Sequence, residues 1–270
     1  MRRKAAEETT TRAGSVQSVS RALTLLELLS DEIEGCRLVD LAGRSGLSPS
    51  TVHRLLTTLE ARHFVQFDPS EGLWHVGRQA FVVGSSFAQH RNFVAQALPY
   101  LRQLRDLTRE TSNLGIVEDG EIVVLTQVES REITRAITRV GGRVPMMASG
   151  MGKAILATYA AEDVAALIAR FGMKRLTLAT IAAPAALARQ LETVRELGYA
   201  VDDEEYVPGL RCVAATIRNH AGESLCAISV SGLAVRMTSD RLPQIGKLLA
   251  RTADDLTRTL GGTGSAAGPT

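Results

Sequence analysis

The fold of the N-terminal part is decided by residues 38–64, which read LVDLAGRSGLSPSTVHRLLTTLEARHF. This stretch predicts two short helices joined by a tight turn. Gly46 stands where a helix commonly ends in the left-handed conformation, and Ser48 and Pro49 are typical of the cap and first residue of a second helix. The apolar residues of that second helix recur at i, i+3, i+4 and i+7 and predict its buried face: Val52, Leu55, Leu56 and Leu59.

The opposite face of the second helix carries small hydroxyl side chains, one imidazole and one cation, crowded toward its N-terminus. A helix-turn-helix protein presents this end of its second helix to the major groove of DNA. The candidate DNA-contacting residues are Ser48, Ser50, Thr51, His53, Arg54 and Thr57. An ordinary helical hairpin would expose a similar polar face to water, so these residues alone leave both interpretations open.

The segment after this helix favours DNA binding. Residues 64–76 alternate in hydrophobicity around the turn sequence DPSEG and predict two short strands. Such a hairpin makes a winged helix-turn-helix, with residues 69–72 on the DNA backbone or in the minor groove. An earlier helix, capped by Ser18 or Ser20, is predicted from an apolar stripe: Val19, Ala22, Leu23, Leu26 and Leu29.

Composition bounds the class of protein. The chain has 270 residues, of which 45% are hydrophobic, and this is enough for two folded domains. The three cysteines have no disulfide or metal-site spacing, and no apolar stretch approaches the roughly 20 residues that cross a bilayer, so we expect a soluble cytoplasmic protein. Acidic and basic residues nearly balance through residue 77, so DNA affinity would depend on a local cationic cluster or on pairing of two domains.

The chain divides into five predicted segments. We expect a disordered arm at residues 1–14, the winged helix-turn-helix at 15–77, a linker and dimerisation helix at 78–91, a second domain at 92–262 and a flexible tail at 263–270. The small and apolar residues of the linker would also allow it to pack on its own domain.

The second domain reads as α+β with an antiparallel sheet. Strands are predicted at 113–118, 121–128, 132–138, 200–206, 212–218 and 224–231, and Asp119-Gly120 is a strong hairpin turn. Helices are predicted at 93–107, with Leu98, Leu101, Leu104 and Leu107 apolar, from 150 to about 160, and at 162–170, 185–197 and 242–260. Consecutive hairpins with helices gathered between them argue against a parallel βαβ sheet.

Several residues of the second domain suit a small anion. Ser149 precedes a helix start at residues 150–153, where free amides and the helix dipole favour negative charge. Ser229 and Ser231 share one face of a strand. Asp202 and Cys212 flank a turn and are placed to reach the same site. Each has an ordinary alternative: solvated serines, a surface aspartate and a small buried cysteine.

Catalysis and metal binding find little support. Cys212 and His220 lack a third orienting group, and the five histidines show no metal-site spacing. No glycine-rich phosphate loop occurs. We therefore expect no catalytic residue, no metal and no cofactor.

Taken together, these motifs resemble the IclR family of transcriptional regulators from about Ser15 to Leu260. The similar stretches are VQSVSRALTLLELL, LSPSTVHRLLTTLE, WHVGRQAFVVGSSF, GGRVPMMASGMGKAILA, GYAVDDEEYVPGLRCVAATI and AISVSG, in this order. The resemblance implies a winged helix-turn-helix, a linker helix and a GAF-like effector domain, acting as a dimer or dimer of dimers on palindromic operator DNA.

The match is most similar to the branch that senses glyoxylate or pyruvate. Carried over onto this sequence, the effector-binding residues are the amides of Gly150 and Met151 and the side chains of Asp202, Cys212, Ser229 and Ser231. Apolar walls would come from Ile133, Ala136 and Leu210. Met151 stands where this branch can have a smaller residue; only its amide is needed, but its longer side chain could shrink or reshape the pocket. The alternatives are an aromatic acid as effector or an enzyme acting on a small oxoacid through Cys212.

Overall fold

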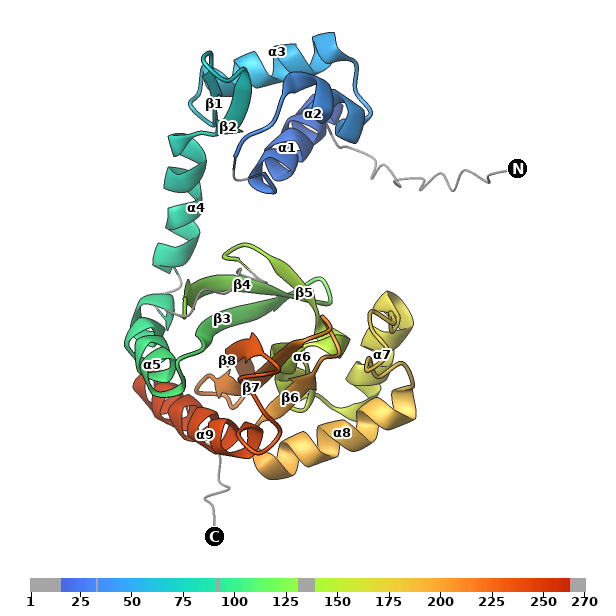
Figure 1. The fold of residues 1–270 in the computed structure, drawn as a ribbon, viewed down its shortest axis with the longest axis vertical. Coiled ribbons are helices and arrows are strands. Elements are labelled where there is room, and N and C mark those ends of the chain that lie inside the picture. Colours follow the sequence, from blue (N-terminus) through green and yellow to red (C-terminus); the bar gives the residue numbers. More distant parts are fainter. Residues whose placement is uncertain (1–15, 33, 91–92, 131–138, 263–270) are drawn as a thin grey trace, which may run out of the picture. The chain divides into compact units, whose positions relative to one another are not determined.

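The computed structural model describes residues 16–32, 34–90, 93–130 and 139–262, which form two compact units that divide between His90 and Arg91 (Figure 1). The whole of the predicted N-terminal arm, the tail and the strand predicted at 132–138 lie outside the described residues.

The first unit is a winged helix-turn-helix. Its helices are α1 (Gln17–Ser30), α2 (Leu38–Ser45), α3 (Pro49–Glu60) and α4 (Arg78–His90), and its wing is formed by β1 (Val65–Asp68) and β2 (Leu73–Val76). The predicted turn is confirmed, because Gly46 has φ 68° and Ser48 Oγ accepts a hydrogen bond from the Thr51 amide at 3.3 Å. Val52 and Leu56 of α3 are fully buried in a core shared with α1, α2 and the wing.

The wing is held on both sides. β1 and β2 pair antiparallel, with Phe67 opposite Trp74, and Glu60 of α3 accepts a hydrogen bond from the Phe67 amide at 3.3 Å. Cys36, just before α2, exchanges two backbone hydrogen bonds with Trp74, each 2.9 Å long. This pairing of Cys36 with the wing was not predicted, because a single backbone bridge leaves no periodic pattern in the sequence.

Two expectations for the helices were wrong. α1 begins at Gln17 with Val16 in the cap position and no side-chain cap, so Ser18 and Ser20 lie inside the helix. Its buried residues are Leu25 and Leu29, whereas the predicted core residues Val19 and Leu23 are 55% and 53% exposed.

The second unit is an α+β domain built on a six-stranded antiparallel sheet of order β5-β4-β3-β8-β7-β6. Its strands are β3 (Thr111–Glu118), β4 (Glu121–Val128), β5 (Arg143–Pro145), β6 (Ala200–Asp203), β7 (Leu210–Arg218) and β8 (Ser224–Leu233). Its helices are α5 (Phe93–Thr108), α6 (Gly150–Leu156), α7 (Ala161–Phe171), α8 (Pro184–Leu197) and α9 (Leu242–Thr259), with a short 3-10 turn at Met146–Ala148. Asp119 and Gly120, with φ 50° and 76°, turn β3 into β4 as predicted.

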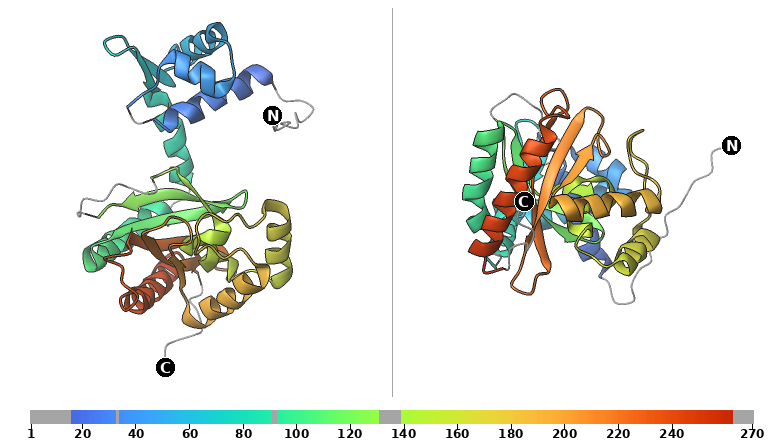
Figure 2. Two further views of the ribbon diagram at one scale, coloured as in Figure 1. Left: turned by 45° about the vertical axis from the view of Figure 1, so that its right-hand side comes forward. Right: turned by 90° about the horizontal axis from the view of Figure 1, so that it is seen from below.

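Two apolar cores cover the two faces of this sheet. α5 and α9 lie side by side on one face (Figure 2), and their core includes Leu101, Leu249 and Val213. The other core joins α6, α7 and α8 to Ala200, Ala214 and Ala227, small residues of neighbouring strands. Small side chains on these strands allow α6 to lie close to the sheet.

Four details of the second unit differ from expectation. Strand β5 was not predicted, α6 ends at Leu156 instead of near Ala160, and β6 ends at Asp203 because Glu204 turns the chain with φ 61°. Leu107, expected in the core, is 60% exposed.

Among the helices that the structure describes, none combines the length and the apolar character that a membrane span requires.

Candidate functional site

Strand register brings together residues that are far apart in sequence. Asp202 on β6 lies opposite Cys212 on β7, and Cys212 lies opposite Ser231 on β8. Ser229 is two residues along β8 from Ser231 and therefore shares its face. Ala200, Ala214 and Ala227 are each two residues from one of these polar residues, so they lie on the same face, and they pack against α6. The predicted polar residues thus form a row on the α6 side of the sheet.

The start of α6 meets this row. Ser149 accepts a hydrogen bond from the Gly152 amide at 3.1 Å and so caps the helix. A Cβ at Gly150 would lie 3.2 Å from Cys212 Sγ, so a larger residue there would have to push the helix from β7. The Met151 side chain is buried in the apolar core, and its sulfur approaches Gly115 on β3. The longer side chain at Met151 therefore packs within the core.

Asp202 is the acid of the site and is 2% exposed. Its Oδ1 accepts hydrogen bonds from the amides of Glu205, at 2.8 Å, and Tyr206, at 3.3 Å. Burial raises the pKa of this carboxyl to about 7, while the charge of Lys153 and these amide bonds oppose the rise. Near neutral pH the group is poised between accepting and donating a hydrogen bond.

A buried ion pair that sequence reasoning missed lies beside Asp202. Lys153 of α6 is fully buried; its Nζ donates to the Glu205 carboxylate and, at 2.5 Å, to the Val201 carbonyl. The second carboxylate oxygen of Glu205 is buried without a hydrogen-bond partner in the described chain. The only signal in the sequence was a lysine within an otherwise apolar helix.

Cys212 is poorly suited to act as a nucleophile. Burial, followed by the nearby charge of Asp202, raises the pKa of its thiol to about 12, although Ser229 and the Gly150 amide donate toward the sulfur. The reactive thiolate is therefore scarce at neutral pH. His220 lies beyond the far end of β7, at least roughly 20 Å along the strand at about 3.3 Å per residue.

Asn113 and Gln127 join the site from the other side of β8. Asn113 Nδ2 donates to Ser229 Oγ at 3.2 Å and to Ser231 Oγ at 3.1 Å, and Gln127 Nε2 donates to Asn113 Oδ1 at 3.0 Å. Sequence reasoning did not single out either residue, although an amide in the middle of an apolar strand was a visible signal.

The predicted wall residues are only partly described. Leu210 is 6% exposed at the start of β7, two residues from Cys212 and on the same face. Ile133 and Ala136 lie outside the described residues. Within the described ranges, no group of His, Cys, Asp and Glu side chains is arranged to hold a metal ion.

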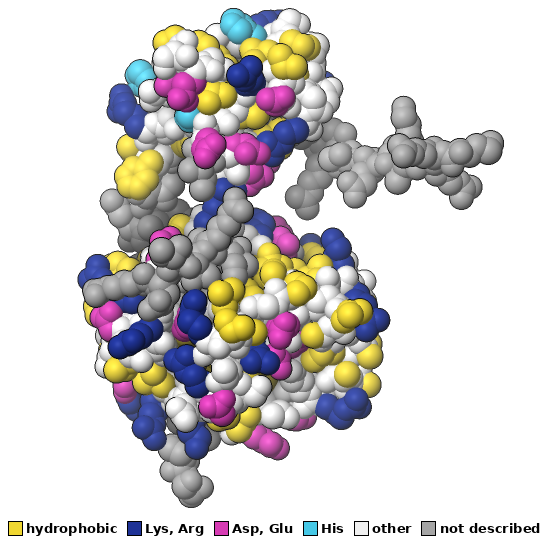
Figure 3. Space-filling model, viewed as in Figure 1, with side chains coloured by type: hydrophobic (Ala, Val, Ile, Leu, Met, Phe, Trp, Pro, Cys, Tyr) yellow, Lys and Arg dark blue, Asp and Glu magenta, His cyan; other side chains and the backbone are white. Residues whose placement is uncertain are grey.

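The predicted DNA-contacting residues lie along the exposed side of α3. Ser48 Oγ lies 3.1 Å from Ser50 Oγ and 2.8 Å from Thr51 Oγ1, and Thr57 Oγ1 donates back to the His53 carbonyl at 3.0 Å. Arg54 is exposed, and its guanidinium has no ion pair within the described chain. Figure 3 shows acidic and basic side chains interspersed on the visible face of this unit.

A hollow of about 330 Å³ separates α3 from the wing, and His53, Thr57 and Glu60 line it opposite Phe67 and Trp74.

The Asp68 carboxylate accepts from the Ser70 hydroxyl at 2.6 Å and from the Ser70 amide at 2.8 Å, and both bonds lower the pKa of Asp68. The wing turn is therefore fixed by its own side chains.

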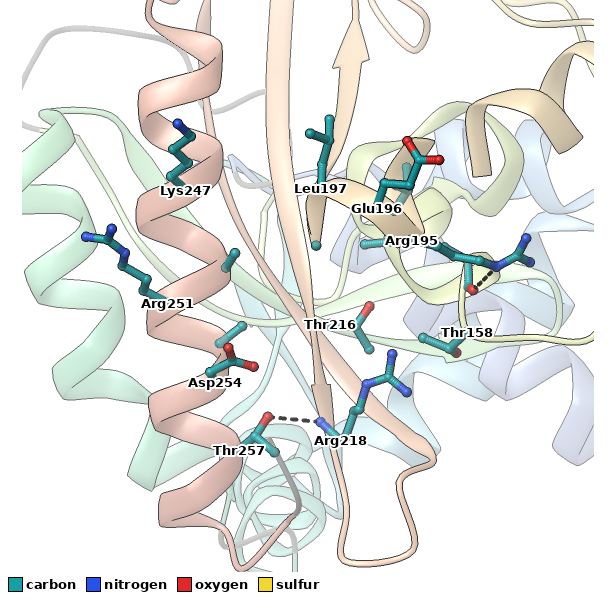
Figure 4. A pocket seen from close by; sticks show the side chains of 16 residues that line it. Thr158, Arg195, Glu196, Leu197, Thr216, Arg218, Lys247, Arg251, Asp254 and Thr257 are labelled. Carbon is teal, nitrogen blue, oxygen red and sulfur yellow. Dashed lines mark hydrogen bonds between the residues drawn. The ribbon is translucent and has the colours of Figure 1, made fainter. Parts of the chain in front are cut away.

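A larger cavity of about 630 Å³ lies between α8, α9 and β7 and contains none of the predicted effector residues (Figure 4). Its Arg195 donates to the carbonyls of Ala157, at 2.7 Å, and Tyr159, at 3.3 Å, so it caps the C-terminal end of α6. Figure 4 shows the charged ends of Lys247 and Arg251 pointing away from Thr216, so these two cations do not converge on the cavity.

Comparison with known proteins agrees with this architecture over nearly the whole chain. The IclR helix-turn-helix domain matches residues 18–69, and the C-terminal domain of the bacterial transcriptional regulator IclR matches residues 85–258. The acetate operon repressor of Salmonella typhimurium is 40% identical over 263 residues, covering 97% of this chain and 96% of that protein. The repressor AllR of Escherichia coli is 36% identical over 245 residues, covering 91% and 90%.

Solved structures give the same result. The IclR protein of Thermotoga maritima superposes with a TM-score of 0.77 at 26% identity, covering 90% of this chain and 98% of that one. A regulator from Rhodococcus sp. RHA1 superposes with a TM-score of 0.79 at 29% identity, covering 92% and 99%. With family models matching both units and relatives aligned almost end to end, the chain belongs to the IclR family of transcriptional regulators, and its two units are the DNA-binding and effector-binding domains of that family.

Proposed function

We propose that the protein is a repressor whose affinity for operator DNA is changed by a small 2-oxo acid, with glyoxylate as first candidate and pyruvate next. The observation that carries this proposal is the row of Asp202, Cys212 and Ser231 beneath the start of α6. Relatives over 90% or more of the chain are named as repressors, one of them for the acetate operon. Genes of glyoxylate or related carbon metabolism are therefore the expected targets.

The proposed effector seat combines donors and one titratable acid. The first-turn amides of Gly150 and Met151 have no acceptor within the helix, and Ser229 and Ser231 add two hydroxyls, so the site offers donors to a carboxylate. Asp202, with its pKa near 7, can donate to the ligand when protonated or accept from the hydroxyls of a hydrated aldehyde. The contact of Gly150 with Cys212 favours a compact ligand over an aromatic acid.

On DNA, the N-terminus of α3 would enter the major groove. The exposed hydroxyls of Ser50 and Thr57, with His53 and Arg54, would meet base edges, and the wing turn would meet the backbone. Apolar side chains exposed in the single chain, including Phe81 on α4 at 77% and Val19 on α1 at 55%, support a homodimer or a dimer of dimers on a palindromic site.

Thermal unfolding of the purified protein with a panel of 2-oxo acids tests the effector. A ligand at 100 times its Kd should stabilise by about 2.7 kcal/mol, a rise in Tm of roughly 5–10 °C. The rise should disappear in Ser229→Ala but persist in Ser112→Ala, whose hydroxyl bonds to the Leu101 carbonyl instead. If only an aromatic acid raises the Tm, the effector is an aromatic acid and not a 2-oxo acid. Turnover of an oxoacid that is lost in Cys212→Ser would instead indicate an enzyme.

Selection of binding sites from random DNA, followed by mobility shifts, tests the regulatory function. We expect an inverted repeat to be enriched and its affinity to change when the stabilising acid is added. An acid that stabilises the protein but leaves DNA affinity unchanged would contradict the proposal, since an effector must bind the DNA-competent and incompetent states differently.

A further inference from the structure

Two amide side chains stand in line with Ser229 and Ser231 on neighbouring strands. Register places Gln127 of β4 opposite Asn113 of β3, and Asn113 opposite Ser229 of β8. Gln127 Nε2 donates to Asn113 Oδ1 at 3.0 Å, and Asn113 Nδ2 donates to Ser229 Oγ at 3.2 Å and Ser231 Oγ at 3.1 Å. The four side chains therefore form one hydrogen-bonded series with a single direction, from Gln127 to the serines.

This direction determines what the serines can offer. A hydroxyl has one proton to donate and two lone pairs to accept with, whereas an amide NH2 group has only protons. Both protons of the Asn113 NH2 group are used on the serine oxygens, so each hydroxyl keeps its own proton for another acceptor. The Ser229 hydroxyl faces the Cys212 sulfur, a weak acceptor from which its proton can turn to a stronger one.

A different buried serine on the same sheet shows the contrast. Ser112 donates to the Leu101 carbonyl at 2.7 Å, so its proton is used within the fold. In the described part of the chain, neither Ser229 nor Ser231 donates to an oxygen or nitrogen acceptor. Asn113 is 2% exposed and Ser229 is fully buried. A buried hydroxyl at Ser229 and a partly buried one at Ser231, both retaining their protons, have the chemistry of an anion seat.

We propose that Asn113, held in orientation by Gln127, is a specificity-determining residue that fixes Ser229 and Ser231 as hydrogen-bond donors, so that the site selects a carboxylate over the matching uncharged amide. This inference rests on the proposed effector seat and adds its ligand selectivity. Asn113 acts through the serines and is a positioning residue. A series of hydrogen bonds with one direction also polarises its last donors, which strengthens their bonds to a carboxylate.

Substitutions at Asn113 test the direction of hydrogen bonding. In Asn113→Asp the new carboxylate can only accept hydrogen bonds, so both serine hydroxyls should donate to it. Their protons are then no longer available to a ligand. Asn113→Leu has a similar size and removes the donor without adding charge. Titration calorimetry with the full chain would compare pyruvate with pyruvamide, which differ at the carboxylate alone.

We expect the native protein to prefer pyruvate. Because a hydrogen bond to a charged group corresponds to a factor of roughly 10–100 in affinity, each Asn113 variant should lose at least about 10-fold for pyruvate and much less for pyruvamide. Loss of selectivity is the informative result, because a general loss of structure would weaken both ligands alike. Pyruvate affinity unchanged in Asn113→Leu, or both affinities reduced equally, would overturn the inference and leave the effector proposal standing.

Substitutions at Gln127 provide a second test, because they leave the residues of the effector seat unchanged. Gln127 is half-buried, so a charged side chain can be placed there. In Gln127→Glu a carboxylate faces Asn113, so the asparagine amide should flip and turn its oxygen to the serines. Pyruvate affinity should fall by about 10-fold in Gln127→Glu and less in the uncharged control Gln127→Met. Equal affinities in all three proteins would overturn the inference. A native protein that binds neither pyruvate nor glyoxylate would overturn the effector proposal and the inference together.

Discussion

The buried carboxyl of Asp202 makes the stability of the second unit depend on pH. Burial raises the pKa of this group from 3.8 to about 7 in the folded protein, whereas the unfolded chain keeps the ordinary value. The folded state therefore retains a proton that the unfolded state has lost between about pH 4 and pH 7. The contribution of this proton to the free energy of unfolding is fully present below about pH 4. As the pH rises from about 4 to about 7 the contribution is lost, which lowers the free energy of unfolding by about 4 kcal/mol at roughly 1.36 kcal/mol per pH unit.

Asp202→Asn isolates this effect because it imitates the protonated acid. The amide oxygen can still accept from the backbone amides of Glu205 and Tyr206, and no charge has to be buried. At pH 5 the native protein carries only part of the penalty, and at pH 8 it carries all of it. Relative to the native protein, the free energy of unfolding of Asp202→Asn should therefore rise by about 2–3 kcal/mol between pH 5 and pH 8. The difference in Tm between the two proteins should increase by about 5–10 °C.

Calorimetry or circular dichroism melts from pH 5 to pH 8 measure this difference directly. Asp203→Asn is the matched control, since the Asp203 side chain is 55% exposed, in contrast to that of Asp202. Its removal should change stability by no more than about 1 kcal/mol at any pH. Parallel Tm curves for the native protein and Asp202→Asn across this range would refute the reasoning, because they would mean that Asp202 is ionised in the fold at no cost.

Three further results are expected. Lys153→Met leaves the buried Glu205 carboxylate unpaired and should lower the free energy of unfolding by about 3–5 kcal/mol in urea titrations, and adding Glu205→Leu should restore much of it; an unaltered midpoint would count against a buried ion pair. Because burial raises the pKa of Cys212 and of Cys226 to about 12, iodoacetamide at pH 8 should label them in unfolded protein and hardly at all in folded protein, as read by mass spectrometry; rapid labelling of the folded chain would contradict this. Arg54→Ala should weaken binding to the selected operator by about 10–100-fold in mobility shifts while the exposed Arg189→Ala of α8 does not, and equal affinities would exclude the proposed docking.

Local chemistry was readable from the sequence wherever a structural requirement is met within a few residues. The left-handed end of α2 at Gly46, the cap and first residue of α3 at Ser48 and Pro49, and the hairpin turn at Asp119 all depend on backbone demands that few residue types satisfy. The shared face of Ser229 and Ser231 likewise follows from the two-residue period of a strand.

Features that depend on distant partners were not readable in the same way. Glu205 is 52 residues from Lys153, and Asn113 is 116 residues from Ser229, so these contacts could be found only in the folded chain. The apolar stripe predicted on α1 was wrong at Val19 and Leu23, although its Leu29 is buried, and this error has another cause. Val19 and Leu23 are as apolar as Leu25 and Leu29, and periodicity reports which residues are apolar without distinguishing a core from a surface that another chain could cover.

The buried charges of the candidate effector site favour an anion that arrives with a proton. With Asp202 ionised, the cluster of Asp202, Lys153 and Glu205 carries one net negative charge, and a carboxylate ligand would add a second within a buried site. Protonating Asp202 makes the cluster neutral, and because burial has already raised its pKa to about 7, this step costs less than about 1 kcal/mol at neutral pH. Each hydroxyl or amide donor to a carboxylate contributes roughly 1.5–3 kcal/mol, which exceeds that cost. Acid affinity should therefore fall up to about 10-fold per pH unit above pH 7, and this dependence should be absent in Asp202→Asn.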